Sequence, residues 1–262
     1  MNAVRRRWLL LAMPVFVGFL LFYIIPFAFS FYYSVIESAF SHEFVGWTNY
    51  EQAITNPYLR LALRNTVEIL VIFVPSLVIA ALALALLVRK LGEKHRLMRA
   101  FLLMPMLLPS AAVANVFSML PFSNARIPIF VMYLWKNCGF LMVLLMAAMS
   151  AIPNLLYQAA AVDGASKWKR FWRITIPQLK PTLFFCTLLA TMYSLRIFKE
   201  AFLLYGAYPQ NEIYLVQHYL NNYFDKLNYQ GLTAASMIFS AILFVAIYLA
   251  LKLEKRMGGD MG

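Results

Sequence analysis

The stretch TVEILVIFVPSLVIAALALALLV at Thr66–Val88 is apolar almost throughout and carries one charged residue, Glu68. Because about 20 apolar residues cross the hydrocarbon core of a bilayer as an α-helix, this stretch predicts a transmembrane helix. The whole chain has the same character, since 63% of its 262 residues are hydrophobic and only 13% are charged. Soluble domains contain about 45–50% apolar and about 25% charged residues. The composition therefore predicts a membrane protein.

Five further apolar runs of similar length flank this helix. They cover residues 8–34, 97–119, 130–152, 182–206 and 233–252. Together with 66–88 they predict six transmembrane helices in a single all-α domain over residues 1–262. The first run follows three arginines, as in a signal peptide, but it is much longer than an h-region of about 7–15 residues. We therefore expect it to be kept as the first span.

Basic residues gather in alternate connections between these runs. They are Arg5, Arg6 and Arg7 before the first run, Arg89, Lys90, Lys94, Arg96 and Arg99 after the second, Lys167, Lys169, Arg170, Arg173 and Lys180 after the fourth, and Lys252, Lys255 and Arg256 at the end. Since cytoplasmic loops are enriched in Lys and Arg, we expect both termini in the cytoplasm. The segments 35–65, 120–129 and 207–232 are then expected on the outer side.

The sequence offers no cluster of catalytic or metal-ligating side chains. His42, His95 and His218 fall on an outer, an inner and an outer loop, so they cannot share a metal ion, and each is expected at the surface. Cys138 and Cys186 lie inside apolar runs, which indicates neither a disulfide framework nor a zinc site. We expect no catalytic residue, metal or cofactor on this chain. The alternative, a membrane-embedded enzyme acting on a lipid-linked substrate, would require such groups gathered on one side.

The connection between the fourth and fifth runs is the most informative loop. Its sequence YQAAAVDGASKWKRFWRITIPQLKP covers Tyr157–Pro181. The alanines predict a helical turn that ends at Asp163-Gly164, and a basic, aromatic helix is expected to begin at Ser166. Pro177 and Pro181 are expected to turn the chain back into the membrane.

This connection resembles the EAA loop of the membrane subunits of binding-protein-dependent ABC importers. That pattern is E-A-A, three residues, G, nine residues, I-x-L-P, and Gln158-Ala159-Ala160, Gly164, Ile174 and Ile176-Pro177 fall in register. The resemblance implies that residues 153–181 form a cytoplasmic loop that docks on an ATPase subunit. The residues expected at this contact are Gln158, Ala159, Ala160, Asp163, Gly164, Ala165, Ser166, Trp168, Phe171 and Pro177. The other interpretation is an amphipathic connector held at the lipid headgroups.

Two departures from the family pattern have different expected consequences. The first position of the loop is Gln158 rather than Glu, and a neutral amide cannot form an ion pair with an ATPase. Between the third and fourth spans only the short segment 120–129 remains, where a longer outer segment is usual. That loss is expected to change the outer rim and not the coupling to the ATPase.

Shorter stretches resemble the carbohydrate-uptake branch of these permeases, of maltose and glycerol-phosphate type. They are Ile24-Ile25-Pro26, Gly46-Trp47-Thr48-Asn49-Tyr50, Asn65-Thr66 and Leu108-Pro109. The resemblance implies an ABC type I importer permease fold in a bacterial-type plasma membrane. This chain would form half of the pathway for a mono- or oligosaccharide, together with a second, homologous permease subunit. Two ATPase subunits would bind and hydrolyse ATP with Mg, and an extracytoplasmic solute-binding lipoprotein would deliver the carbohydrate.

Charged residues inside the fifth apolar run mark a candidate pathway site. If its helix begins near Thr182, Arg196 lies about 21 Å along it at about 1.5 Å per residue, where inserting a charge costs about 2.5–3.5 kcal/mol. Arg196 and Glu200 are spaced i,i+4 and are expected to pair, which leaves Lys199 over. We expect Tyr193, Arg196, Lys199 and Glu200 to line the pathway, with a net positive charge that favours an acidic or mixed saccharide.

The same cluster has a second interpretation, a salt bridge that holds two permease subunits together. Glu68 could neutralise the surplus positive charge. Lys136 follows Trp135 at the start of the fourth run and is expected to extend to the outer headgroups. Tyr205 is expected at the membrane interface, where Tyr is enriched. For Tyr193 two interpretations stay open, a position at the membrane interface and stacking of a sugar on its ring.

Overall fold

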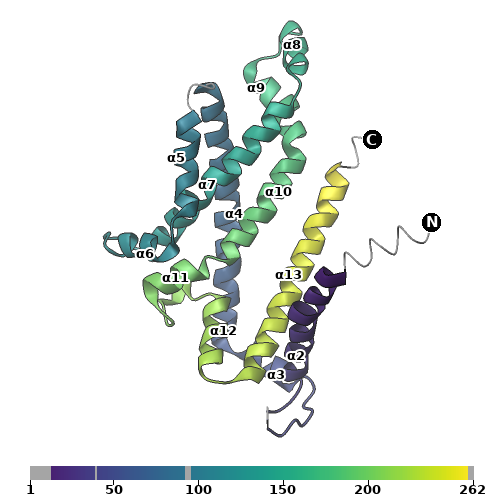
Figure 1. Ribbon diagram of the computed structural model, residues 1–262, viewed down its shortest axis with the longest axis vertical. Coiled ribbons are helices and arrows are strands. Elements are labelled where there is room, and N and C mark those ends of the chain that lie inside the picture. The colour runs from purple at the N-terminus through teal and green to yellow at the C-terminus, as the bar shows by residue number, and fades with distance from the viewer. Residues whose placement is uncertain (1–12, 39, 92–95, 259–262) are drawn as a thin grey trace, which may run out of the picture. The chain divides into compact units, whose positions relative to one another are not determined.

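The computed structural model describes residues 13–38, 40–91 and 96–258, and its regular structure is helical (Figure 1). The helices are η1 (Leu20–Ile24), α2 (Ile25–Ser34), α3 (Thr48–Thr55), α4 (Pro57–Leu91), α5 (Arg96–Leu107), α6 (Ser110–Ser118), α7 (Arg126–Ala151), α8 (Asn154–Val162), α9 (Lys167–Arg170), η3 (Phe171–Thr175), α10 (Ile176–Leu195), α11 (Phe198–Tyr205), η4 (Asn211–Ile213), α12 (Val216–Asp225) and α13 (Tyr229–Gly258). Within the described residues the β-structure is one isolated bridge, between Ile36 and Phe44. The all-α prediction is confirmed.

Five helical segments of the described chain are long and apolar enough to cross a membrane, and a bent pair of helices can supply a sixth. The five segments are Met13–Ser34, Pro57–Lys90, Arg126–Ala151, Lys167–Tyr205 and Tyr229–Lys252. The arginines at 5–7, Lys94, His95 and the tail from residue 259 lie outside the described residues. The apolar runs of the sequence therefore mark the spanning helices, although several helices extend beyond them.

Helix α4, the second predicted span, begins at Pro57, before its apolar run at 66–88, because Asn56 caps it. The Asn56 side-chain oxygen accepts a hydrogen bond from the backbone N–H of Tyr58 at 2.9 Å. Pro57 occupies the first helical position, where its missing N–H costs nothing. The segment expected as an outer loop at 35–65 consequently contains α3 and the first turns of α4.

The third predicted span is not one straight helix. Its two parts, Leu97–Leu107 and Ser110–Ser118, meet at an angle of 88°. Leu108-Pro109 lies at the break, and Pro109 has an extended backbone with φ −58° and ψ 132°. Proline disfavours helical geometry in the residue before it and lacks an N–H for the helical ladder. In Figure 1 α6 therefore turns away from α5, and it packs against α11.

The described chain divides into two compact units. Unit 2 contains Ala62–His218 and the chain from Ala250 onward. In this unit α7 packs against both α5 and α10, and the buried side chains include Leu77 of α4, Leu145 of α7 and Leu179 of α10. The Tyr133 hydroxyl donates to the Ala190 carbonyl at 2.8 Å, which satisfies a buried polar group between α7 and α10.

A close approach of α5 to α7 depends on Gly139. A Cβ atom placed there would overlap the carbonyl oxygen of Leu102, which is backbone and cannot rotate away. We expect Gly139→Ala to destabilise the protein by about 1–3 kcal/mol, the usual cost of overpacking. The measurement is the thermal unfolding midpoint in detergent. Gly18→Ala is the control, because a Cβ at Gly18 meets nothing within 4 Å; equal midpoints for the two variants would contradict the prediction.

Unit 1 contains the chain up to Leu61 and Tyr219–Leu249. The Asn49 amide in α3 donates to the carbonyls of Ser34 at 3.1 Å and Ile36 at 2.8 Å, and the hydroxyls of Ser34 and Tyr50 are 2.6 Å apart. These bonds fix α3 beneath the end of α2. No residue in the most apolar window of Met13–Ser34 is buried within the described structure.

Candidate functional site

The predicted coupling loop consists of two short helices joined at Gly164. At the end of α8 the Ala165 N–H donates to the Ala160 carbonyl at 2.9 Å, and the Gly164 N–H donates to the Ala161 carbonyl at 3.1 Å. Gly164 has φ +73°, so this is a Schellman motif, whose left-handed residue is usually glycine. The Ser166 hydroxyl then caps α9 by accepting from the Lys169 N–H at 3.3 Å. The expected helix end and helix start are confirmed.

The surface of this loop is open. Gln158, Ala159, Asp163, Gly164, Ser166 and Trp168 are exposed, whereas Ala160, Ala165, Phe171 and Pro177 are partly buried. Val162 is 90% exposed and Trp168 is 70% exposed. Apolar side chains exposed on a loop that carries five basic residues nearby give a surface suited to another protein or to headgroups.

The loop is held to the helix that follows it by Tyr157. The hydroxyls of Tyr157 and Thr175 are 2.9 Å apart, and the Tyr157 carbonyl accepts from Arg170 at 3.4 Å. Arg89 of α4 lies over the Tyr157 ring, 6.0 Å from its centroid. These contacts join α8 to α9 and to η3, which leads into α10.

The expectation that Pro177 and Pro181 turn the chain is wrong. The helix continues from Lys167 through the π-helical turn η3 into α10, with Pro177 in the first turn of α10 and Pro181 inside it. Wider π turns are typical of places where the regular hydrogen-bond ladder is interrupted. Here the wide turn precedes Pro177, which has no N–H to donate, so the helix passes both prolines without a reversal.

The four predicted pathway residues, Tyr193, Arg196, Lys199 and Glu200, line one cavity of about 410 Å³ in unit 2. Ser110, Lys136 and Asn137 contribute to the same wall. The side chains that the sequence grouped together between residues 193 and 200 thus lie at one cavity. The sequence prediction missed those of α6 and α7, which reach the cavity only through the packing of separate helices.

The pairing inside the cavity differs from the prediction. Glu200 pairs with Lys136, with Oε1 and Nζ 2.9 Å apart, and the Ser110 hydroxyl donates to the same Glu200 oxygen at 2.8 Å while accepting from Lys136 at 2.7 Å. Arg196 does not pair with Glu200 because the helix breaks at Arg196–Ile197, between α10 and α11. The i,i+4 spacing places two residues on one face only in an unbroken helix.

Lys136 was expected at the outer headgroups, and that expectation is wrong. Its side chain is 13% exposed and that of Glu200 is 14% exposed. A charge without a partner in a mostly buried position is costly, and each of these two charges offsets part of the desolvation cost of the other. The remaining cations of the cavity, Arg196 and Lys199, are exposed, and neither forms an ion pair with a described residue.

Glu68 does not neutralise this cavity. It pairs with Arg64 at 2.8 Å and with Arg126 at 3.0 Å. Arg126 also donates to the Glu212 carbonyl at 2.8 Å and to Asn65 at 3.2 Å. Glu68 is thus part of a network that joins α4, α7 and η4, and the surplus positive charge of the cavity stays with Arg196 and Lys199.

Of the histidines, His42 is exposed as expected, but His218 is fully buried. Its Nδ1 accepts from the Leu215 N–H at 3.1 Å, and the Phe198 ring packs edge-on against it with centroids 4.8 Å apart. Burial lowers the pKa of His218 to about 4, so the ring is neutral at physiological pH. The surface prediction failed because the ring of Phe198 in α11 and the ring of Tyr214 both pack against His218.

The neutral His218 predicts a pH dependence of stability. In the unfolded chain His titrates near pH 6.5 and in the fold near pH 4, so between these values the unfolded state binds more protons. The contribution of the neutral His218 to the free energy of unfolding is then fully present above about pH 6.5. It falls as the pH drops toward 4, by up to about 3 kcal/mol. Thermal midpoints from pH 7.5 to pH 4.5 measure the effect. His218→Asn keeps an acceptor for Leu215 without this titration, and an unchanged pH slope in that variant would contradict the assignment.

In unit 2 a polar cavity lies among helices apolar enough to span a membrane, and an exposed two-helix loop extends from them, an arrangement suited to membrane transport. The sequence pattern of the family described as "Binding-protein-dependent transport system inner membrane component" matches residues 78–259, and the chain belongs to this family. The prediction of a permease subunit in a multi-pass membrane protein is thereby confirmed, and the membrane-enzyme alternative is not supported.

Curated relatives cover most of the chain. The sulfoquinovosyl glycerol transport system permease protein SmoG of Agrobacterium fabrum is 29% identical over 84% of this chain and 80% of its own length. The trehalose/maltose transport system permease protein MalF of Thermococcus litoralis is 28% identical over 92% of this chain and 91% of its own length. Both are sugar transport permeases by name.

Among solved structures, a chain of a bacterial ABC transporter involved in the import of the acidic polysaccharide alginate has the same fold. The TM-score is 0.83, with 97% of this chain and 98% of that chain covered at 21% identity. The expected ABC importer permease fold is thereby confirmed.

Proposed function

We propose that this chain forms half of the translocation pathway of an ATP-driven importer for a carbohydrate. A second, homologous permease subunit supplies the other half, and an extracytoplasmic solute-binding lipoprotein delivers the solute. Two ATPase subunits bind ATP and Mg, and this chain binds no cofactor. Both termini lie in the cytoplasm of a bacterial cell. The relatives named for trehalose, maltose and sulfoquinovosyl glycerol support a carbohydrate as the solute class.

The observation that carries this proposal is the turn at Gly164. A Cβ there would meet nothing within 4 Å, although the residue has the left-handed φ of +73°, so the space beside it is free for a partner. If the ATPase subunits bind α8 and α9, their closure would move these two helices as a rigid body. Tyr157, bonded to Thr175 of η3, would pass this movement to α10.

The cavity of unit 2 supports the pathway role. Charged groups form stronger hydrogen bonds to hydroxyls than neutral groups do, and they provide a countercharge for an acidic solute. Since Lys136 and Glu200 satisfy each other, Arg196 and Lys199 are the groups left to bind the solute. Their charge favours a saccharide that carries an acidic group.

The assembly is tested by purifying the tagged subunit from its native membrane in mild detergent and identifying its companions by mass spectrometry. We expect a second permease, an ATPase and a binding lipoprotein. Recovery of this chain alone, with no ATPase even after cross-linking from Lys167 or Lys169, would overturn the proposal. Both lysines are exposed on α9, so a docked ATPase would lie within reach of a cross-linker.

The pathway role predicts the behaviour of Lys199→Met. Because Lys199 is exposed in the cavity and unpaired among the described residues, we expect solute uptake to fall while the assembly stays intact. Uptake in whole cells and the amount of co-purified partner permease measure the two effects. Loss of the partner permease with this variant would instead favour a salt bridge between the two permease subunits.

A further inference from the structure

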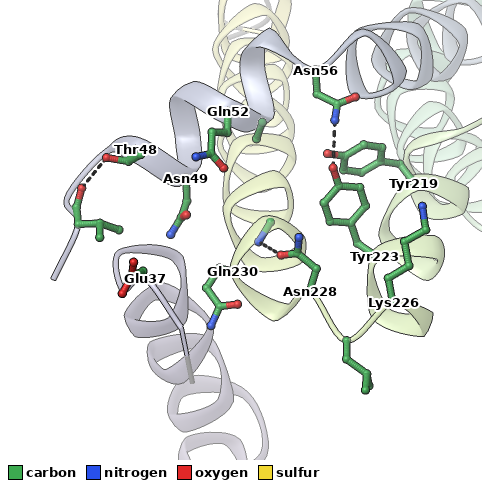
Figure 2. Close-up of a pocket in the computed structure, with 14 residues that line it drawn as sticks. Glu37, Thr48, Asn49, Gln52, Asn56, Tyr219, Tyr223, Lys226, Asn228 and Gln230 are labelled. Atoms are coloured by element: carbon green, nitrogen blue, oxygen red, sulfur yellow. Dashed lines mark hydrogen bonds between the residues drawn. The ribbon is translucent and has the colours of Figure 1, made fainter. Parts of the chain in front are cut away.

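A second cavity lies entirely within unit 1 and shares no lining residue with the cavity of unit 2. It has a volume of about 670 Å³ and is formed by the loop before α3, α3 itself, the end of α12 and the start of α13. Small-molecule sites in proteins occupy about 300–1,000 Å³, so this cavity is of a suitable size. Figure 2 shows side chains of Asn49, Gln52 and Gln230 around the same space.

The lining is rich in carboxamides. Asn49, Gln52, Asn56, Asn228 and Gln230 all contribute, and each carboxamide offers an acceptor oxygen and two N–H donors. Sugar hydroxyls also donate and accept, so a ring of carboxamides matches a polyhydroxylated ligand without requiring a charge.

The charges of the cavity balance. One carboxylate, Glu37, and one ammonium group, Lys226, line it. Neither forms an ion pair with a described residue. The cavity of unit 2 differs, because Arg196 and Lys199 leave it positive. The unit 1 cavity is therefore suited to the hydroxyls of a solute rather than to an acidic group.

The carboxamides differ in how many of their N–H donors already have a hydrogen-bond partner. The Asn49 N–H groups are used by Ser34 and Ile36, and the Asn56 N–H group is used by the Tyr223 hydroxyl at 3.0 Å. The Gln230 Nε2 is buried and has no hydrogen-bond partner in the described structure. Buried polar groups are nearly always paired, so the Gln230 amide would gain a partner if its side chain turned toward a ligand oxygen in the cavity that this residue lines.

The wall on the α12 side is preformed. The rings of Tyr219 and Tyr223 stack with centroids 4.4 Å apart. Tyr223 lies so close to α13 that a Cβ on Gly231 would come within 2.6 Å of its ring. The Gly231 N–H also donates to the Asn228 side-chain oxygen at 2.9 Å. Few groups would have to move when a ligand enters, which lowers the cost of binding.

We propose that this cavity is a second saccharide site of the importer, which binds the solute through its hydroxyls on the outer side of the membrane. The inference rests on the proposed function, which supplies both the solute class and the orientation. In that orientation the loop before α3 and the connection between α12 and α13 face the side from which the solute arrives.

The test is protection of a cysteine from labelling in the full complex, in right-side-out membrane vesicles. Gln52→Cys is made in a background with Cys138→Ala and Cys186→Ala, because Gln52 is exposed and lines the cavity. Glu51→Cys is the matched control, an exposed neighbour in α3 that does not line it. A membrane-impermeant maleimide is applied with maltose, trehalose or digalacturonate. At about ten times its dissociation constant a bound saccharide slows labelling by about tenfold.

We expect at least one of the three saccharides to protect Gln52→Cys saturably and to leave Glu51→Cys unaffected, and Gln230→Leu to remove the protection. Protection by the binding protein without a sugar, or no protection by any of the three saccharides, would each overturn the site. Failure of the proposed function gives a different result, the absence of ATPase and partner permease from the purified assembly. An intact importer without protection would therefore refute the second site alone.

Discussion

Gly164→Asp is expected to abolish solute uptake while the subunit stays in the membrane in its normal amount. A side chain at φ +73° is strained by about 1–2 kcal/mol, which is too little to remove the whole protein from the membrane. Because a Cβ at this position meets nothing within 4 Å in the described structure, we expect the larger effect to come from losing the proposed contact with the ATPase. Uptake in cells and ATPase stimulation in the purified complex measure the loss.

Two control variants separate backbone strain from loss of docking. Gly164→Asn introduces a side chain that tolerates the left-handed region. It therefore tests whether the ATPase must approach the turn closely, with less backbone strain than other side chains would cause. Gly46→Asp makes the same change at another glycine of positive φ, +60°, on the predicted outer segment. We expect Gly164→Asn to be impaired and Gly46→Asp to transport. Full uptake with normal ATPase stimulation in Gly164→Asp would refute the coupling role.

Lys136→Met is expected to destabilise the protein by about 3–5 kcal/mol, because it leaves the Glu200 carboxylate without its cation in a mostly buried position. Glu200 would keep the Ser110 hydroxyl, at 2.8 Å, but a hydroxyl does not neutralise a charge. The thermal midpoint of the detergent-purified protein measures the effect. Lys199→Met is the control, since it removes an exposed lysine that has no ion pair among the described residues.

The double variant Lys136→Met with Glu200→Gln tests the pair itself. Removing both charges eliminates the unpaired carboxylate, so we expect the midpoint to recover most of the loss. A double variant as unstable as the sum of the two single variants would show that the two side chains do not interact. Uptake by a stable double variant would further show whether the pair positions α6, α7 and α11 or contacts the solute.

Part of this site was predictable because its signals are local. The turn at Gly164 follows from an alanine-rich helix, a glycine and a capping serine within a few residues, and the structure has each of them. The grouping of Tyr193, Arg196, Lys199 and Glu200 follows from one helical segment. The pairing within that group was wrong, because a two-residue break at Arg196–Ile197 changes which faces the residues occupy.

Hydrophobicity and contacts between near neighbours were enough to predict an all-helical membrane protein, its apolar segments and the turn at Gly164. The permease class followed from the resemblance of residues 157–181 to a family loop. Only the tertiary structure decided that Lys136 neutralises Glu200, that His218 is buried beneath Phe198, and that carboxamides of α3 and α13 share one cavity. The reason is physical: each of these contacts joins segments far apart in the chain, and helix packing, rather than spacing along the sequence, brings them together.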